Sequence, residues 1–224
     1  MERTIIITED GSHSISIPEL NVTYHSIHGA IQESKHVFIE AGLKYLFDRF
    51  ANKQPWILEV GFGTGLNALL TAIEAEKTET SIYYVALEPL PISDDDASLL
   101  NYCELLNRKD LQEDFERIHD CEWNKSIAFT ENVLMHKSGC TLQTFEHGPG
   151  FDLIYYDAFA PAAQPELWMK EIFQKLFDLL KPNGVLVTYC SKGDVRRAMM
   201  AASFTVKKLP GPPGKREILR AMKN

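Results

Sequence analysis

The chain alternates between two patterns of hydrophobic positions. Short apolar runs, such as residues 55–60 (PWILEV) and 151–156 (FDLIYY), are typical of strands buried on both faces of a sheet. Longer segments repeat their apolar residues every three or four positions, which indicates helices with one buried face. In residues 36–50 that face consists of Leu43, Leu46, Phe47 and Phe50.

Strands and helices are expected to follow one another through most of the chain. Strands are predicted over residues 55–60, 81–89, 151–156 and 184–190, and helices over residues 65–77, 93–107 and 165–181. Because strand–helix–strand connections are right-handed and set their strands in parallel, this order predicts an α/β fold with a mostly parallel sheet covered on both faces. A binding site is then expected at the carboxyl ends of the strands, where the strand order reverses.

The first residues depart from this alternation. Residues 4–8 and 14–18 are rich in strand-forming residues and flank Asp10-Gly11, a dipeptide typical of hairpin turns. The predicted organisation is therefore an N-terminal hairpin and lead-in segment over residues 1–34, followed by one Rossmann-like domain over residues 35–224.

Two later segments also depart from the alternation of strands and helices. Residues 127–146 are expected to form a pair of strands that turns at residues 137–139 (Lys-Ser-Gly). The end of the chain is predicted as a helix over residues 192–202 followed by strands over residues 204–210 and 216–222.

Composition limits the class of protein. A chain of 224 residues that is 45% hydrophobic can bury the core of one large domain. No apolar stretch approaches the roughly 18 residues that suggest a membrane span, and the first residues lack the pattern of a secretory leader. These features predict a cytoplasmic protein. The cysteines lack metal-binding spacing, so we expect buried free thiols and no metal site at Cys103, Cys121, Cys140 and Cys190.

Charge is distributed unevenly. The formal net charge is −8, but residues 192–224 carry nine Lys and Arg against two acids, a net of +7, and residues 1–191 carry 14 against 29, a net of −15. A basic terminal region on an acidic protein is either a solvated surface or a local site for a polyanion.

The glycine loop is the first candidate site. Gly61, Gly63 and Gly65 follow a predicted strand and open a predicted helix, so a cofactor can approach the backbone closely and an anion can meet free N–H groups at the helix start. The spacing excludes a phosphate-binding loop of the G-x-x-x-x-G-K-[ST] type. We include Asn67, at the end of the motif EVGFGTGLN, among the candidate cofactor-binding residues.

Two acids near this loop indicate which cofactor it binds. Glu59 stands immediately before the loop, where a carboxylate repels a pyrophosphate but suits the ammonium of a methionine moiety. Glu88, 23 residues after Gly65, is placed at a strand end to accept hydrogen bonds from ribose hydroxyls, which any nucleoside cofactor presents. Glu59 therefore favours S-adenosylmethionine over a dinucleotide, while Glu88 supports a nucleoside cofactor without choosing between the two.

Three segments together resemble one family. LEVGFGTGLN (58–67), YYDAFAPAAQPELW (155–168) and the tail with FTVKKLPGPPGKREILRA (204–221) are similar to the methyltransferase domain of MnmC, the bifunctional bacterial enzymes of tRNA 5-methylaminomethyl-2-thiouridine synthesis, and of its stand-alone relatives. Residues 23–43 resemble the segment that leads into the first strand of that domain. The resemblance implies a class I S-adenosylmethionine-dependent methyltransferase fold with a seven-stranded, mostly parallel sheet. The implied reaction is N-methylation of the aminomethyl group of 5-aminomethyl(-2-thio)uridine at the wobble position of tRNA.

Under this resemblance the segment 155–168 becomes the candidate catalytic loop. Asp157 is expected to bind the incoming amine and to balance the charge that grows on its nitrogen, although a carboxylate in a loop can also cap the next turn. Pro161 and Pro165 stiffen the loop. Phe159 is expected to stack on the target base, to seat the sulfonium through its ring face or to pack within the protein, and Trp168 is expected in the core.

The resemblance also assigns a partner to the basic terminal region. A patch at the strand ends can contact tRNA phosphates without a basic protein overall. The cations expected to contact substrate, together with Phe159 and Pro161, are Lys192, Arg196, Arg197, Lys215 and Arg216.

The chain also departs from the family pattern. Bifunctional members carry a flavin-dependent oxidoreductase domain after this one, whereas the present sequence stops at Asn224, so we expect a separate enzyme to supply the aminomethyl group. The adenine contact is not assigned, with Gln143 and Glu146 as candidates. Two alternatives stay open, a methyltransferase for a small-molecule amine and a non-catalytic module that binds tRNA or cofactor. The sequence indicates no oligomeric state.

Overall fold

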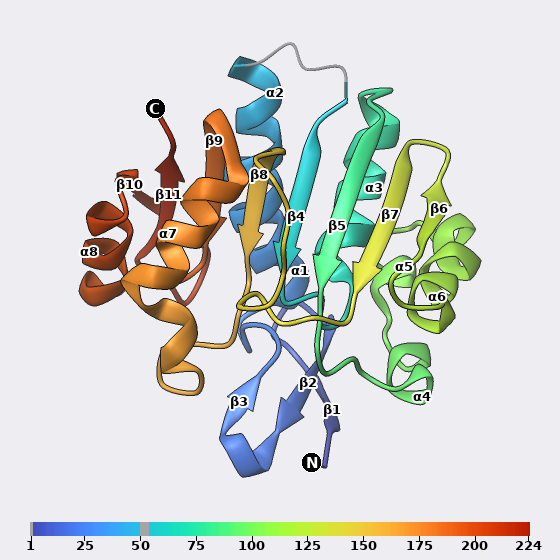
Figure 1. Cartoon of the computed structure of the whole chain (residues 1–224). Helices are drawn as coiled ribbons and strands as arrows, with labels where there is room; N and C mark the ends of the chain where they lie inside the picture. The colour runs from blue at the N-terminus through green and yellow to red at the C-terminus, as the bar shows by residue number, and fades with distance from the viewer. Residues whose placement is uncertain (1, 50–53) are drawn as a thin grey trace.

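The computed structural model describes residues 2–49 and 54–224 (Figure 1). Within them eight strands form one sheet in the order β10-β11-β9-β8-β4-β5-β7-β6. The strands are β4 (Trp56–Val60), β5 (Ile82–Leu87), β6 (Ser126–Thr130), β7 (Val133–Ser138), β8 (Phe151–Tyr156), β9 (Leu180–Thr188), β10 (Thr205–Pro210) and β11 (Glu217–Met222). The predicted α/β architecture is confirmed.

The centre of the sheet is parallel and its edges are antiparallel. Strands β9, β8, β4, β5 and β7 pair in parallel, while β6, β11 and β10 add antiparallel pairs at the two edges. Within the described residues this sheet thus has one strand more than the seven of the expected family fold. The sheet is mostly parallel, as predicted, so the carboxyl ends of its central strands lie at one edge.

The predicted turn at residues 137–139 is wrong. Strand β7 continues through Ser138 in parallel register with β5, and the turn of the β6–β7 hairpin lies at residues 131–132. Lys137 looks like a turn residue in the sequence, but its side chain is buried. Its Nζ lies 4.3 Å from the centre of the Trp123 ring and donates a hydrogen bond to the His119 carbonyl at 3.0 Å, and these contacts compensate for burying the charge. Residues 139–146 leave the sheet, and some of them reach the pocket described below.

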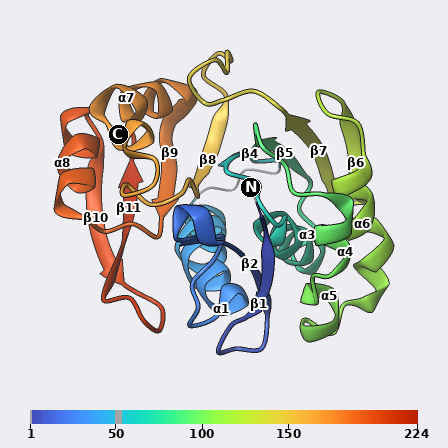
Figure 2. The same cartoon turned by 90° about the horizontal axis from the view of Figure 1, so that it is seen from below.

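Helices cover both faces of the sheet (Figure 2). One face carries a continuous helical stretch of α1 (Ala30–Ser34), the π-helical η2 (Lys35–Lys44) and α2 (Tyr45–Arg49), beside α3 (Leu66–Lys77); the other carries α7 (Lys170–Leu179) and α8 (Gly193–Ala201). Beside β7 and β6 lie α4 (Asp94–Ser98), α5 (Tyr102–Leu105) and α6 (Gln112–Asp120). The short helices are η1 (Pro18–Leu20), η3 (Lys109–Leu111) and η4 (Pro165–Trp168).

The helix predicted over residues 36–50 is confirmed as far as Arg49, and Phe50 lies outside the described residues. The stretch begins earlier, at Ala30, and runs across the predicted boundary between residues 34 and 35. No described helix has the length and apolar character needed to cross a membrane.

The single helix predicted over residues 93–107 is instead two, α4 and α5. Ser93 starts α4 as expected, since its Oγ accepts a hydrogen bond from the Asp96 amide at 3.1 Å. The helix is interrupted before Asn101, whose side chain bonds to the N-terminal hairpin. Its Oδ1 accepts a hydrogen bond from the His13 amide at 2.8 Å, and its Nδ2 donates one to the Gly11 carbonyl at 3.0 Å. A tertiary contact therefore overrides the helical pattern.

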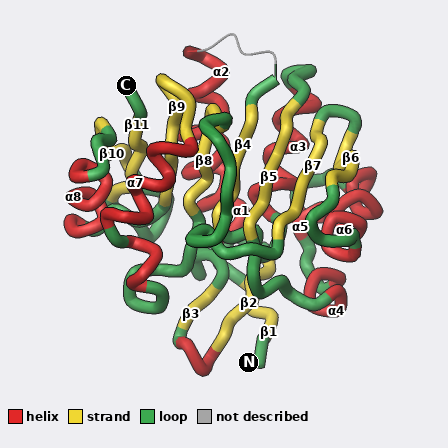
Figure 3. Tube along the Cα trace, in the orientation of Figure 1, coloured by secondary structure: helices red, strands yellow, loops and turns green. Residues whose placement is uncertain are grey.

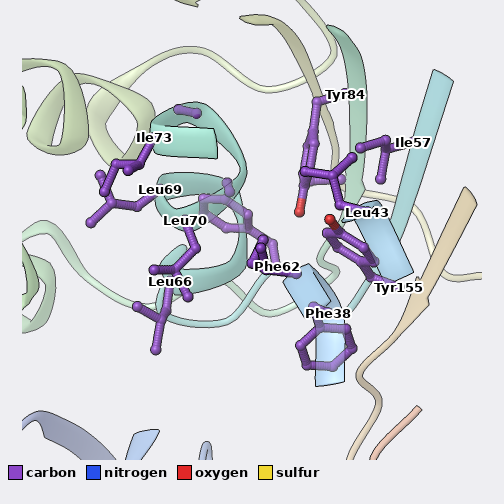
Figure 4. Close-up of a cluster of buried hydrophobic side chains, with 14 of the residues drawn as sticks. Phe38, Leu43, Ile57, Phe62, Leu66, Leu69, Leu70, Ile73, Tyr84 and Tyr155 are labelled. Atoms are coloured by element: carbon purple, nitrogen blue, oxygen red, sulfur yellow. The ribbon is translucent and has the colours of Figure 1, made fainter. Parts of the chain in front are cut away.

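Alternation along the strands divides the core into two layers. On β4, Ile57 packs into the layer beneath η2 and α3, while Leu58 and Val60 pack into the layer beneath α7. On β8, Tyr155 and Tyr156 divide in the same way. Figure 4 shows part of the first layer, where Phe38, Leu43 and the apolar face of α3 meet the strands.

The N-terminal hairpin is confirmed and has a third strand. Strands β1 (Thr4–Ile7), β2 (His13–Ile17) and β3 (Val22–Thr23) form a separate antiparallel sheet. It lies against the carboxyl ends of the central strands, below their arrowheads in Figure 1 and in yellow at the bottom of Figure 3. The edge at which a binding site is expected is therefore covered by a second element.

Candidate active site

A cavity of about 440 Å³ lies where the carboxyl ends of β4, β5 and β8 meet the N-terminal sheet. The chain crosses from β4 to β5 on one side and reaches β8 on the other, so the cavity sits at the reversal of strand order. Its volume is that of a small-molecule site. Its walls come from the glycine loop, the end of β5, the loop after β8, residues 141–143 and the N-terminal segment.

The glycine loop forms one wall and admits only glycine at two positions. Gly61 has φ +90°, and a Cβ there would lie 2.6 Å from the Asp157 carbonyl oxygen. Gly63 has φ +51°, and a Cβ would lie 2.9 Å from the ring of Tyr24. Both line the cavity, whereas Gly65 begins α3 and faces His119. Two of the three predicted glycines therefore border the cavity.

Glu88 lies at the end of β5 and lines the cavity as predicted. Its Oε2 accepts a hydrogen bond from the Gly63 amide at 3.1 Å and its Oε1 from the Leu90 amide at 2.9 Å. Burial raises the pKa of this carboxyl. Each oxygen still has a lone pair for a ligand hydroxyl.

Asp157 emerges from the end of β8 into the same cavity. Its amide donates to the Val60 carbonyl at 2.9 Å, which ties it to the strand that carries the glycine loop. Its Oδ2 accepts a hydrogen bond from Asn67 Nδ2 at 2.9 Å. Burial, with the nearby Glu33 carboxylate, raises the pKa of Asp157 to about 7, against the lowering effects of Asn67 and Lys215.

Glu59 and Asn67 lie behind the wall rather than in it. Both are buried, Glu59 completely and Asn67 with 2% exposed, and neither lines the cavity. Asn67 Nδ2 donates to Glu59 Oε1 at 2.9 Å. Burial raises the pKa of Glu59 well above its usual value. The structure therefore brings Asn67 against Asp157, and Glu59 lies on the other side of Asn67.

The loop after β8 is stiffened by hydrogen bonds as well as by prolines. Trp168 is buried, as predicted, and its Nε1 donates to the Phe159 carbonyl at 2.8 Å. The Tyr189 hydroxyl donates to the Ala158 carbonyl at 2.9 Å. Phe159 lines the cavity and meets the Tyr24 ring edge-on, with centroids 5.2 Å apart. Pro161 is half-buried outside the cavity lining.

Comparison with known proteins agrees with this geometry. A family model described as S-adenosyl-L-methionine-dependent methyltransferase matches residues 115–224. The tRNA 5-methylaminomethyl-2-thiouridine biosynthesis bifunctional protein MnmC of Pseudomonas entomophila is 32% identical over 210 residues, which cover 89% of this chain and 32% of that protein. MnmC of Burkholderia thailandensis is 31% identical over 237 residues, with 96% and 34% covered. The chain belongs to this methyltransferase family.

Solved structures show the same fold. MNMC2 from Aquifex aeolicus superposes with a TM-score of 0.75 at 24% identity and covers 98% of this methyltransferase and 70% of that chain. Spermidine synthase from Thermotoga maritima superposes with a TM-score of 0.56 at 15% identity, with 99% and 69% covered. The methyltransferase spans about a third of the length of the curated relatives it matches.

The cavity of this methyltransferase fits S-adenosylmethionine, the cofactor of its family. Gly61 and Gly63 line it without side chains of their own, and Glu88 presents acceptors in the same lining. Gln143 also lines the cavity, whereas Glu146 does not, so only the first of the two adenine candidates is in reach. Among the described residues no group of three or more His, Cys, Asp or Glu side chains is placed to hold a metal ion.

The predicted cations separate into two groups. Lys192, Arg197 and Arg216 are exposed and Arg196 is half-buried, at the start of α8 and in the β10–β11 loop. Lys215 is turned inward instead. Its Nζ forms an ion pair with the buried Glu33 and lies 4.0 Å from the centre of the Tyr189 ring. All four cysteines are free, as expected, but only Cys103 and Cys190 are buried.

The residues that sequence reasoning missed come mostly from the N-terminal segment. Arg3, Tyr24 and His25 line the cavity, and so does Phe62 of the glycine loop. His25 is held by Thr64 of that loop, with its Nε2 2.7 Å from Thr64 Oγ1, and burial lowers its pKa to about 4. The resemblance of residues 23–43 to the family was the only signal in the sequence that pointed to this segment.

Proposed function

We propose that this chain methylates the amine of 5-aminomethyl(-2-thio)uridine at the wobble position of tRNA, in the cytoplasm. The observation that carries the proposal is that Asp157 borders the cavity directly beside the glycine loop. The relatives named for tRNA 5-methylaminomethyl-2-thiouridine biosynthesis cover 89% and 96% of the chain, which supports the same substrate class.

The cofactor is expected to be held by Gly61, Gly63 and Glu88. The two glycines let it approach the backbone, and Glu88 accepts hydrogen bonds from its ribose hydroxyls. When bound, S-adenosylmethionine supplies an electrophilic methyl group. Glu59 and Asn67, which the sequence assigned to the cofactor, are better placed to act on Asp157.

Asp157 provides the charge that an amine substrate needs. Among the described residues its Oδ2 accepts the only hydrogen bond to the side chain, so Oδ1 is available to an incoming ammonium. With a pKa of about 7, the carboxyl is ionised enough at neutral pH to bind that ammonium and basic enough to receive a proton from it at Oδ1. The carboxylate also stabilises the charge that develops on nitrogen as it attacks. Alignment by the stiff loop adds to the rate.

The exposed cations support binding of a polyanion. Lys192, Arg197 and Arg216 stand on the surface near the carboxyl edge of the sheet, where phosphates can reach them while a nucleotide enters the cavity. The substrate must already carry a primary amine, so a separate enzyme that installs the aminomethyl group is part of the proposal.

Transfer of labelled methyl groups tests this function. The enzyme is incubated with labelled S-adenosylmethionine and tRNA that contains or lacks aminomethyluridine, and the nucleosides are then separated. Label in methylaminomethyluridine from the first tRNA alone is expected. Label in neither tRNA would contradict the proposal, and saturable transfer to a small amine without tRNA would favour the small-molecule alternative.

A further inference from the structure

The side chain of Asn67 joins two carboxyl groups. Its Nδ2 donates one hydrogen bond to Glu59 Oε1 and one to Asp157 Oδ2, both at 2.9 Å. Both amide hydrogens are thus used within the protein, and the residue lies outside the cavity lining. The side chain of Asn67 therefore has no donor left for a cofactor.

The two carboxyl groups differ in environment. Glu59 is completely buried in β4, and the hydroxyl of the equally buried Tyr84 lies near its carboxyl group. Burial raises the pKa of Glu59 well above the usual value. Asp157 borders the cavity, and its pKa of about 7 leaves it partly ionised at neutral pH. Glu59 thus fixes one hydrogen of the amide, and the other hydrogen is aimed at the reacting carboxylate.

The backbone of Asn67 is held by the fold. Asn67 lies in the first turn of α3, and the Thr71 hydroxyl donates to its backbone carbonyl at 2.7 Å, whereas the side-chain Oδ1 has no hydrogen-bond partner among the described residues. A flipped amide would set its oxygen against two carboxyl groups, so the observed orientation is the stable one. The arrangement is rigid because strand, helix and loop meet at one side chain.

We propose that Asn67 is a positioning residue, which holds the Asp157 carboxylate in place at the cavity by bridging it to the buried Glu59. The inference rests on the proposed function for the step that Asp157 assists. The bridge orients Oδ2 and leaves Oδ1 to the amine. A hydrogen bond to a carboxylate also favours its ionised form, so the bridge sets the pH range in which Asp157 can bind and accept a proton.

The first test is a pH titration of Asp157 itself, monitored by NMR of its carboxyl carbon in the isotope-labelled enzyme without tRNA. The titratable groups around Asp157 are Glu33, Glu59, Tyr84, Tyr189 and Lys215. All of these groups remain in Asn67→Ala, so a change in the Asp157 midpoint of this variant reflects only the loss of the Asn67 hydrogen bond. Its Asp157 midpoint is expected about one pH unit above that of the wild type, because a donor to the charged form is lost.

A matched control is Asn101→Ala. Asn101 also makes two hydrogen bonds through its side chain, to His13 and Gly11, but it touches neither carboxyl group. It is expected to leave the Asp157 midpoint unmoved. Glu59→Gln keeps an oxygen that can accept from Asn67, so it is expected to retain a midpoint near that of the wild type, whereas Glu59→Leu is expected to raise it. Equal midpoints in the Asn67 and Asn101 variants would overturn the proposal.

The second test is the pH dependence of methyl transfer. Asn67→Ala is expected to lower kcat by about tenfold, to move the acid limb of the profile to higher pH and to change the KM for S-adenosylmethionine by less than about twofold. A raised KM with unchanged kcat would instead make Asn67 a cofactor-binding residue and refute the inference. Asn67→Ser, which is too short to span both carboxyl groups, serves if the alanine variant does not fold and has the same expected outcome.

The two tests separate the inference from the proposed function. If wild-type enzyme does not methylate aminomethyluridine, the proposed function fails, and the titration still decides whether Asn67 fixes Asp157. If turnover is normal and the midpoint does not respond to Asn67→Ala, the inference alone fails.

Discussion

The candidate active site and the basic terminal region hold their polar and charged side chains in opposite ways. Asp157, Glu59 and Asn67 are joined by short hydrogen bonds and mostly buried, whereas Lys192 and Arg216 are exposed. A methyl transfer requires a fixed distance and angle between reacting atoms, so its groups must be held. Attraction of phosphates acts over about 10 Å of salt solution and tolerates mobile side chains.

Lys215 shows that sequence neighbours can fall on different sides of this division. It stands beside Arg216 in the segment GKRE, yet its Nζ pairs with buried Glu33 and lies over Tyr189. The Tyr189 hydroxyl in turn holds the loop of Asp157 through the Ala158 carbonyl. Lys215 therefore belongs to the fixed part of the molecule, and its role is to connect the β10–β11 loop, the N-terminal helix and the catalytic loop.

The largest expected effect is that of Asp157→Asn. The variant keeps the shape of the side chain but removes its charge and its proton acceptor, so turnover is expected to fall by about 100-fold or more, with cofactor affinity within a few-fold. The single-turnover rate with tRNA measures the loss of turnover, and a binding titration with S-adenosylmethionine measures the cofactor affinity. A variant of normal rate would show that the fixed carboxylate is not part of the chemistry.

Gly61→Ala is expected to show how tightly the wall is built. A Cβ at this position would meet the Asp157 carbonyl oxygen at 2.6 Å with φ at +90°, so the free energy of unfolding is expected to drop by about 2–3 kcal/mol. Gly11→Ala is the matched control, because its φ of +83° imposes similar backbone strain but nothing lies within 4 Å. It is expected to cost about 1 kcal/mol. Denaturant titration compares the two, and equal losses would mean that backbone strain alone explains the glycine.

Lys215→Met and Arg216→Met compare the two kinds of cation directly. Removing Lys215 leaves the buried Glu33 without its cation, so a loss of about 1–3 kcal/mol in the free energy of unfolding is expected. Removing the exposed Arg216 is expected to change it by less than about 0.5 kcal/mol. Denaturant titration of both variants measures the difference. Similar stabilities would place Lys215 with the surface cations.

The smallest effect is expected from the surface cations and only on tRNA binding. The double change Lys192→Gln and Arg216→Gln is expected to raise the KM for tRNA by about tenfold with unchanged kcat. It is also expected to reduce the slope of log KM against log salt by about one for each phosphate that the variant no longer neutralises. Lys109→Gln, on η3 beside α6 and far along the sheet, serves as the control. A salt slope unchanged by the double variant would contradict the proposed docking surface.

Much of the fold could be predicted because it depends on local patterns. The strand runs, the glycine loop and the helix over residues 36–49 follow from hydrophobic period and backbone freedom, and the structure confirms them. The predictions that failed involve distant partners. Trp123 hides Lys137 inside β7, and the hairpin captures Asn101 and divides a helix.

The candidate site was predictable only in part, for a related reason. Gly61, Gly63, Glu88 and Asp157 all reach the cavity, because the ends of neighbouring parallel strands meet at one edge. Tyr24 and His25 carry no chemical motif of their own. They reach the cavity because the N-terminal sheet folds back over that edge, a placement that no local pattern in residues 1–34 indicates.

The sequence by itself determined the alternation of strands and helices, the glycine loop and the stiff acidic loop after the predicted strand over residues 151–156, since each depends on residues close together along the chain. Only the tertiary structure decided which charged groups face the cavity and which stand behind it. Glu59, Asn67 and Lys215 each took a place different from the predicted one, because burial and partner are set by the packing of segments that are distant in sequence.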